Sequence, residues 1–239
     1  MGKSKYRRVL LKLSGESFCE PGGFGINGGA LESIAERILQ IAKLGPQVAV
    51  VAGAGNFLRG ESFSEVSGIP RNTADYMGML ATIINSCALQ EALEKFGQPT
   101  RVLSAIEVSA ICERFIRRRA LRHLEHGRVV ILAGGTGNPF FTTDTCAALR
   151  ATELDADLLV KATKVDGVYS DDPEKNPDAE LFERLSYDDV LKKNLRVMDQ
   201  SAICLCRDNG IRIIVLNIFK EGNITKAVCG EKVGTLISE

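Results

Sequence analysis

The sequence has no excess of charge of either sign, because 30 lysine and arginine residues balance 30 aspartate and glutamate residues. It also has no tryptophan and two histidines, His123 and His126. A neutral chain creates no protein-wide field that would attract nucleic acid or an anionic membrane surface. The two histidines lie one helical turn apart just before Gly127, where a helix C-terminus favours cationic side chains without any catalytic role. Partners must therefore be argued from local sites.

The seven cysteines form no CxxC pair, and their number is odd. We interpret them as reduced thiols rather than as a disulfide framework. Cys204 and Cys206 lie two apart on an expected helix and point in different directions, which disfavours a zinc pair.

The sequence also lacks any apolar stretch long enough to span a membrane. The apolar run in MGKSKYRRVLLKLSGE is too short for the core of a signal peptide, and Tyr6 stands where a myristoylation signal needs serine or threonine. We therefore expect a cytoplasmic protein without a membrane partner.

Apolar strand patterns alternate with amphipathic helix patterns along most of the chain. Strands are expected at residues 7–15, 47–53, 100–105, 128–135, 156–163 and 212–217. Helices are expected at residues 29–45, 72–97, 117–127, 142–154, 187–193 and 199–209, with a short one before GTLIS. Asn72 or Thr73 is expected to cap the second helix, and Thr142 or Thr143 the fourth.

This alternation is typical of a parallel sheet that is covered by helices on both faces. We predict an α/β fold, a three-layer α/β/α sandwich around a mostly parallel sheet, formed as a single domain by residues 1–239. Ligands of such sheets bind beyond the carboxyl ends of the strands. We expect four segments to converge there: KLSGES (12–17), GAGNFLRG (53–60), GGTGNPFFTTD (134–144) and TKVDGVYSDDP (163–173).

The first two of these segments are glycine turns that suit phosphate, because glycine lets backbone amides approach an anion closely. One such turn is most often a tight bend, but two turns with Lys12 and Arg59 beside them favour phosphate binding. The chain lacks GxxxxGK[ST], and GAGNFLRG lacks the GxGxxG spacing of a dinucleotide site. Lysine, arginine, backbone amides and Mg²⁺ are the groups that phosphoryl transfer needs.

The third segment carries two adjacent aromatic residues, Phe140 and Phe141. They are core residues by default, but the neighbouring Asn138, Thr142 and Thr143 are suited to read the edge of a flat base. A nucleotide substrate fits both the phosphate turns and this segment.

Six segments together resemble the successive motifs of the bacterial UMP kinase family, within the amino acid kinase superfamily: LLKLSGE, GAGNFLRG, DYMGMLAT, GGTGNPFFTTD, VKATKVDGVYSDDP and VMDQSA. The resemblance covers essentially the whole chain and implies an amino acid kinase-like fold. TGNPFFTTD and KATKVDGVY are specific to that family, whereas glutamate, aspartate and carbamate kinases share the glycine turns. The resemblance implies phosphoryl transfer from ATP to UMP with Mg²⁺, giving UDP and ADP in pyrimidine nucleotide biosynthesis.

The resemblance also implies which residues bind each nucleotide, with UMP on the part at about 1–155 and ATP on the part at about 156–239. The residues implied for ATP are Lys12, Leu13, Ser14, Gly15, Gly55, Arg59, Thr163, Tyr169 and Asp172. Those implied for UMP are Ala54, Asp75, Thr136, Gly137, Asn138, Pro139, Phe140, Phe141, Thr142 and Thr143. Asp75, expected in the first turn of its helix, would accept from the ribose hydroxyls or else complement the helix N-terminus.

The catalytic residues implied in the same way are Lys12, Arg59, Asp144 and Lys164. Lys12 and Lys164 would stabilise the transferring phosphoryl group, and Asp144 would orient them, although Lys164 fits a solvated loop lysine equally well. Asp199 caps a helix by its position, and the likeness implies a place near the site. No residue is expected to hold a metal apart from the nucleotide complex.

The family resemblance further implies a homohexamer of stacked dimers, activated by GTP and inhibited by UTP. The segment GGFGIN resembles its effector segment, with the residues Gly22, Gly23, Phe24, Gly25, Ile26 and Asn27. Asn27 stands where an aspartate is common, and Ala54 where the family usually has a second glycine.

Three alternatives remain open from the sequence. In the first alternative the chain is another small-acid kinase of the same fold, and in the second it is a nucleotide-sensing protein without catalysis. The basic segment RFIRRRALRH binds nucleic acid or is a solvated helix face, and the shortage of interleaved aromatic residues favours the solvated face.

Overall fold

The computed structural model describes residues 2–173, 175–176, 178–195 and 197–239. The strands found there are β1 (Arg8–Leu13), β2 (Gln47–Ala52), β3 (Thr100–Ser104), β4 (Glu113–Arg114), β5 (Val129–Ala133), β6 (Leu158–Thr163), β7 (Val168–Tyr169), β8 (Leu181–Phe182), β9 (Arg184–Ser186), β10 (Arg212–Asn217) and β11 (Thr235–Ser238). The helices are η1 (Gly15–Phe18), α1 (Gly28–Ala42), α2 (Gly60–Ser67), α3 (Arg71–Lys95), α4 (Arg117–Glu125), α5 (Thr143–Glu153), α6 (Tyr187–Lys192), α7 (Gln200–Asp208) and α8 (Asn223–Cys229).

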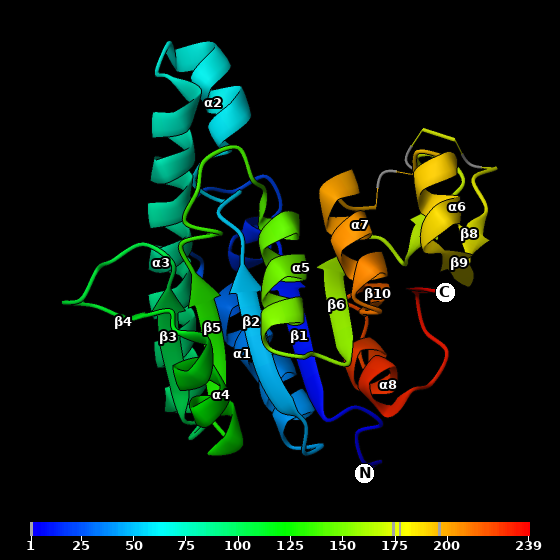
Figure 1. Ribbon diagram of the computed structural model, residues 1–239, viewed down its shortest axis with the longest axis horizontal. Coiled ribbons are helices and arrows are strands. Elements are labelled where there is room, and N and C mark those ends of the chain that lie inside the picture. Colours follow the sequence, from blue (N-terminus) through cyan, green and yellow to red (C-terminus); the bar gives the residue numbers. More distant parts are fainter. Residues whose placement is uncertain (1, 174, 177, 196) are drawn as a thin grey trace.

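Most of these strands form one large sheet (Figure 1). Across the described residues, nine strands follow the order β4-β3-β5-β2-β1-β6-β10-β11-β9. All neighbours in it run parallel except β10 and β11, which are antiparallel. Strands β7 and β8 form a separate antiparallel pair. The mostly parallel sheet expected from the apolar strands is therefore confirmed.

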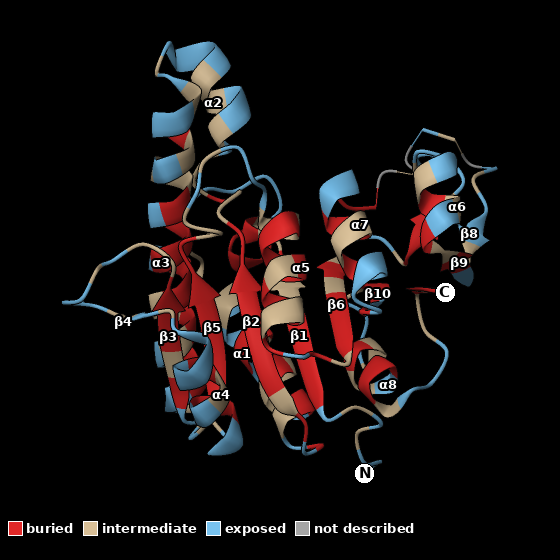
Figure 2. Ribbon diagram, viewed as in Figure 1, coloured by how far each residue is buried: buried red, intermediate tan, exposed pale blue. Residues whose placement is uncertain are grey.

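The two faces of the sheet bury different side chains, because successive residues of a strand point to opposite sides. On β1, Leu11 and Leu13 pack into a cluster with residues of α1, α3 and α8. Leu10, on the other side of the same strand, packs with residues of α4, α5 and α7. The strands are accordingly buried between two helical layers (Figure 2). This arrangement is the predicted three-layer α/β/α sandwich.

Helix α3 begins earlier than the sequence predicted. Its N-cap is Pro70, whose carbonyl accepts a hydrogen bond from the amide of Ala74 at 3.0 Å, so neither Asn72 nor Thr73 is the cap. Proline suits this place because it has no amide hydrogen to satisfy at the start of a helix. As a result Asp75 is the fifth residue of α3 and does not lie in the first turn. The prediction for the fourth helix is confirmed, since Thr142 caps α5.

Helix α2 was not predicted, because GESFSEVS carries no apolar face. None of its residues is buried. It packs beside the first turns of α3 and projects with them beyond the sheet, where both are largely exposed (Figures 1 and 2). Among the described residues, no helix combines the length and the apolar character that a membrane crossing requires.

The sheet order explains where a ligand site must form. Strands β5, β2, β1 and β6 are consecutive neighbours and run in the same direction. Their carboxyl ends therefore meet at one edge, and the segments that follow them converge there as expected.

Candidate functional site

A cavity of about 450 Å³ opens at this edge of the sheet. Its walls come from the turns after β1, β2 and β5, from β6, and from α3 and the starts of α5 and α7. The lining residues are Lys12, Ser14, Gly15, Gly53, Ala54, Gly55, Leu58, Arg59, Gly60, Glu61, Arg71, Asp75, Gly78, Met79, Thr82, Gly135, Thr136, Phe141, Thr142, Thr143, Asp144, Lys161 and Asp199.

The two glycine turns touch each other through their backbones. A Cβ atom added to Gly15 would lie 2.2 Å from the amide nitrogen of Gly55 and 2.7 Å from the carbonyl carbon of Ala54. No side chain fits at such distances, so glycine at position 15 is required by space. The turns after β1 and β2 thus form one continuous backbone wall of the cavity.

This wall has unused hydrogen-bond donors. Within the described residues, the amides of Ala54, Gly55 and Asn56 donate to no protein acceptor. Ala54 is not among the residues with positive φ, and its carbonyl accepts from the amides of Phe57 and Leu58. Ala54 and Gly55 line the cavity, and successive amides without protein partners are the groups from which anion-binding concavities are built. The methyl group of Ala54 does not prevent the turn from forming.

Asp144 lies between two lysines. One carboxylate oxygen is 2.8 Å from the ammonium of Lys12, and the other accepts a hydrogen bond from Lys161 at 2.8 Å. Lys12 and Lys161 are partners in register on the adjacent strands β1 and β6. All three side chains are largely buried. Lys161 is anchored further by donating to the carbonyl of Val197.

The surroundings of Asp144 and Lys161 shift the pKa values of both side chains. Burial by itself would raise the pKa of Asp144, but the charges of Lys12 and Lys161 outweigh burial and lower it. The pKa of Lys161 is lowered, chiefly by burial and also by the charge of Lys12, against the opposing effect of Asp144. Asp144 is therefore an anion at neutral pH and acts as an acceptor that fixes both lysines.

The start of α5 fixes the position of Asp144. The hydroxyl of Thr142 accepts from the amide of Asp144 at 3.0 Å and from that of Thr145 at 3.3 Å. It also donates to Asp199, which accepts a second hydrogen bond from the hydroxyl of Thr145 at 2.8 Å. Asp199 occupies the N-cap position of α7 but its side chain makes no capping bond there. Its carboxylate instead joins α7 to α5, which corrects the interpretation of Asp199 as a simple cap.

The α3 side of the cavity presents a different chemistry. The Nε–H of Arg71 donates a bifurcated hydrogen bond to the two carboxylate oxygens of Asp75, at 3.0 and 3.1 Å, and the amide of Phe140 donates to Asp75 at 2.8 Å. Phe140 has a φ of 70°. The side chains of Phe140 and Phe141 are 68% and 55% exposed, so they are not core residues. The loop thus offers its aromatic rings to the exterior beside the cavity.

A second cationic group surrounds Glu16. Its carboxylate forms ion pairs with Arg59 and, at 3.4 Å, with Lys164. Hydrogen bonds from both partners lower the pKa of Glu16 against the opposing effect of burial. Arg59 and Lys164 are much more exposed than the lysines around Asp144. Long exposed side chains of this kind can reorient toward an anion.

The predicted site residues divide into those that line the cavity and those that do not. Those that line it are Lys12, Ser14, Gly15, Ala54, Gly55, Arg59, Asp75, Thr136, Phe141, Thr142, Thr143 and Asp144. Those outside its lining are Leu13, Gly137, Asn138, Pro139, Phe140, Thr163, Lys164, Tyr169, Asp172 and the segment 22–27. The side chain of Leu13 is fully buried, so it can act there only through its backbone.

The pairing expected for Asp144 needs a correction. Asp144 orients Lys12 and Lys161, whereas Lys164 contacts Glu16. Lys161 was missed because its segment was treated as an apolar strand. A signal was present, because a lysine within the apolar segment ADLLVKAT needs either a charge of opposite sign or a path to solvent for its ammonium group.

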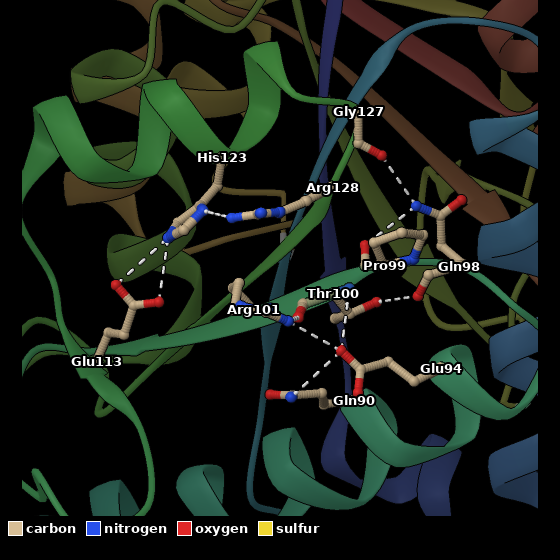
Figure 3. A network of polar contacts seen from close by, with 10 residues as sticks. All are labelled: Gln90, Glu94, Gln98, Pro99, Thr100, Arg101, Glu113, His123, Gly127 and Arg128. Atoms are coloured by element: carbon tan, nitrogen blue, oxygen red, sulfur yellow. Dashed lines mark hydrogen bonds and ion pairs between the residues drawn. The ribbon is translucent and has the colours of Figure 1, made fainter.

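The two histidines have structural surroundings, and Figure 3 shows those of His123. The Nε2 atom of His123 lies 3.1 Å from a carboxylate oxygen of Glu113, and its Nδ1 accepts from Arg128 at 2.8 Å. His126 is the C-cap of α4. Arg117 and Arg119 of the same helix form ion pairs with Asp155 and Glu113. These contacts favour a solvated, ion-paired helix face.

Comparison with known proteins identifies the family and supports the fold. The sequence model of the amino acid kinase family matches residues 7–217. The crystal structure of UMP kinase from Bacillus anthracis is 42% identical, with a TM-score of 0.94 over 98% of this chain and 96% of that chain. UMP kinase from Ureaplasma parvum is 37% identical, with a TM-score of 0.91 over 100% of both chains. Uridylate kinase from Archaeoglobus fulgidus is 29% identical, with a TM-score of 0.73 over 96% of this chain and 99% of that chain.

Replacing Asp144 by asparagine should lower the free energy of unfolding by about 3 kcal/mol at pH 7, because two buried lysines lose their counter-ion. A carboxyl with a lowered pKa in the folded state stabilises fully above its unfolded pKa of about 3.9. The difference from wild type should therefore be constant from pH 7 to about pH 5 and shrink below about pH 4. Urea denaturation across this range measures it.

The double variant Asp144→Asn with Lys161→Met is the control for this prediction. Removal of one lysine should restore part of the lost stability. A double variant that is less stable than Asp144→Asn would show that repulsion between the lysines is not the cause.

Proposed function

Because the chain belongs to the amino acid kinase family, we propose that it is a UMP kinase, which transfers the γ-phosphoryl group of ATP to UMP and gives UDP and ADP in pyrimidine nucleotide biosynthesis. The observation that carries the proposal is the pair of lysines held by Asp144 beside the unpaired amides of the second glycine turn. Positive charge and preorganised donors in a partly closed cavity are what a transferring phosphoryl group requires.

In this proposal, phosphates of ATP bind along the backbone wall, with Ser14, Gly15, Gly55 and Arg59. Arg59 would leave Glu16 for a phosphate, since their ion pair is exposed and inexpensive to break. We propose that the adenosine end lies on the part at 156–239, on Thr163, Tyr169 and Asp172. Lys164, which follows Thr163 and reaches Glu16 at 3.4 Å, connects that part to the phosphate wall.

UMP is proposed to bind on the α3 side. A carboxylate has about four acceptor positions, so Asp75 retains capacity for ribose hydroxyls after accepting the bifurcated bond from Arg71 and the bond from Phe140. Thr136, Phe141, Thr142 and Thr143 line the cavity from the loop after β5. The outer part of the same loop would contact uracil, and it consists of Gly137, Asn138, Pro139 and Phe140.

The proposed reaction needs no general base. A phosphate monoester has a second pKa of about 6, so the attacking oxygen of UMP is deprotonated at neutral pH. That oxygen forms a bond to the γ-phosphorus of ATP as the bond from this phosphorus to the bridging oxygen breaks, and ADP leaves. Lys12 and Lys161 stabilise the negative charge of the transferring group, and Asp144 keeps both ammonium groups in place.

We propose that Mg²⁺ takes part as a complex with the ATP phosphates. The described residues include no cluster of three or more histidine, cysteine or acidic side chains arranged for a metal ion. Asp144, Glu16 and Asp75 are each paired with cationic side chains. This donor set fits a metal that arrives on the nucleotide, as Mg²⁺ commonly does. When bound, Mg²⁺ would neutralise phosphate charge.

Helix α3 supplies a surface for the oligomer that the resemblance implies. Tyr76, Leu80 and Ile84 recur every four residues and are 44%, 49% and 51% exposed. Residues at this spacing share one face of a helix. We propose that this apolar face packs against another copy of the chain in a homohexamer.

Activation by GTP, inhibition by UTP and a cytoplasmic location remain predictions.

A coupled assay of ADP release with ATP and Mg²⁺ tests the proposed function. Turnover is expected with UMP and should exceed turnover with CMP, glutamate, aspartate or carbamate. Release with an amino acid but not with UMP would identify another small-acid kinase. Absence of turnover with every acceptor, together with nucleotide binding by calorimetry, would favour a sensing protein.

Lys12→Met should lower kcat by on the order of a hundredfold or more while the KM for UMP stays nearly unchanged, because the lysine acts mainly on charge in the transition state. Lys161→Met should give a similar loss. Lys164→Met is the matched comparison, and its effect should be smaller because the side chain is half exposed. Wild-type turnover by Lys12→Met would refute the catalytic role of Lys12.

Ala54→Gly should leave the kcat and the KM for UMP within a few-fold of wild type, because the turn already has a φ that alanine accepts. It should reduce the free energy of unfolding by up to about 1 kcal/mol through added entropy of the unfolded chain. Steady-state kinetics and urea denaturation measure the two effects. A tenfold gain in kcat/KM would mean that the methyl group obstructs the phosphate cradle.

A further inference from the structure

Two buried asparagines lie directly behind the phosphate wall. Asn56 ends the second glycine turn and is 2% exposed, and Asn85 lies in the middle of α3 and is fully buried. Their amides form a reciprocal pair, in which each Nδ2 donates to the Oδ1 of the other at 2.9 and 2.8 Å. Neither side chain lines the cavity.

The remaining donor of each amide reaches a backbone carbonyl. Asn85 donates to the carbonyl of Gly53 at 2.8 Å, and Asn56 donates to the carbonyl of Gly25 at 2.7 Å. The backbone of Asn56 also accepts from the amide of Gly25 at 2.8 Å. An asparagine side chain has two N–H donors, so all four donors of the pair are used. Loss of either residue leaves buried groups without partners.

These bonds connect three parts of the chain. Gly53 begins the turn after β2, Gly25 belongs to the segment 22–27, and Asn85 is fixed in the long helix α3. A ring contact between Phe24 and Phe57, with centroids 5.6 Å apart, joins the segment to the turn at a second place. The turn cannot shift toward or away from the cavity without breaking bonds to the asparagine pair.

We propose that Asn56 and Asn85 are positioning residues, which hold residues 53–56 in the conformation that presents free amides to phosphate and which couple this turn to the segment 22–27. The inference rests on the proposed function in one respect, namely that nucleotide phosphates bind at this turn. The coupling is a property of the fold and applies with or without the reaction. An effector that displaces the segment 22–27 would act on phosphate binding through Asn56.

The test compares Asn85→Ala with two variants of the same helix. Ser86→Ala removes a buried hydroxyl that donates to the carbonyl of Thr82 within α3, and Leu89→Ala removes a buried core side chain one turn away. Asn85→Ala should lower kcat/KM for ATP or UMP at least tenfold at a temperature where every variant is folded. Ser86→Ala and Leu89→Ala should stay within threefold of wild type, even where Leu89→Ala lowers Tm as much as Asn85→Ala. Equal losses of kcat/KM at equal Tm would overturn the positioning role.

A second measurement does not depend on activity. Hydrogen–deuterium exchange of the full-length protein without nucleotide should accelerate in peptides covering 20–27 in Asn85→Ala, although Asn85 makes no direct hydrogen bond to that segment. Leu89→Ala should leave this exchange unchanged. Unchanged exchange in Asn85→Ala would overturn the coupling, whereas a wild-type protein without kinase activity would overturn the proposed function alone.

The pair can also be tested as a unit. Asn56→Ala and the double variant with Asn85→Ala should lower kcat/KM by about the same factor as Asn85→Ala, because either change breaks the same reciprocal bonds. If the fold losses of kcat/KM in the two single variants instead multiply in the double variant, the two residues act independently of each other. Asn56→Ala also replaces Asn85→Ala in both measurements if the latter does not fold.

Discussion

The contact of Asp144 with Lys12 and Lys161 governs the construction of this edge of the sheet. Two lysines stand in register on neighbouring strands whose other residues are almost all apolar. Side by side and largely buried, their ammonium groups would repel each other without a carboxylate between them. The start of α5 brings that carboxylate, Thr142 caps the helix, and Asp199 links the cap to α7. The strands β1 and β6 and the helices α5 and α7 are therefore arranged around the carboxylate of Asp144.

The charges around the cavity are unevenly distributed, and the division matches two kinds of ligand group. Near β1 and β6, four cationic side chains accompany three carboxylates, since Asp144 and Glu16 each pair with two cations and Asp199 lines the cavity close enough for its charge to act on Lys161. On the α3 side the balance is reversed, because Arg71 faces both Asp75 and Glu61. An anionic group is favoured at the first end and a hydroxylated one at the second. A molecule with a phosphate and a sugar has this polarity.

The sequence predicted most of the architecture because the central strands are mostly apolar and apolar residues recur at helical spacing between them. Convergence of the four loops followed from the direction of parallel strands alone. Where the prediction failed, contacts distant in sequence decided the outcome. Lys161 on β6 meets Asp144 at the start of α5, and Asp199 bonds to α5 instead of its own helix. Helix α2 was missed for a different reason, because it buries no residue and its sequence carries no apolar face. The asparagine pair joins residues 29 positions apart, and nothing in either local pattern signals it.

Helix α2 has a consequence for how the sequence can vary among relatives. Its ends are constrained, because its N-cap Arg59 and its first residues, Gly60 and Glu61, line the cavity, and Arg71 lines it just after the helix. Between them, no residue of the helix is buried. Exposed substitutions away from special contacts usually change stability by no more than about 0.5 kcal/mol. The exposed positions in the middle of α2 can therefore change during evolution at little cost in stability, whereas the residues at its borders form part of the cavity wall.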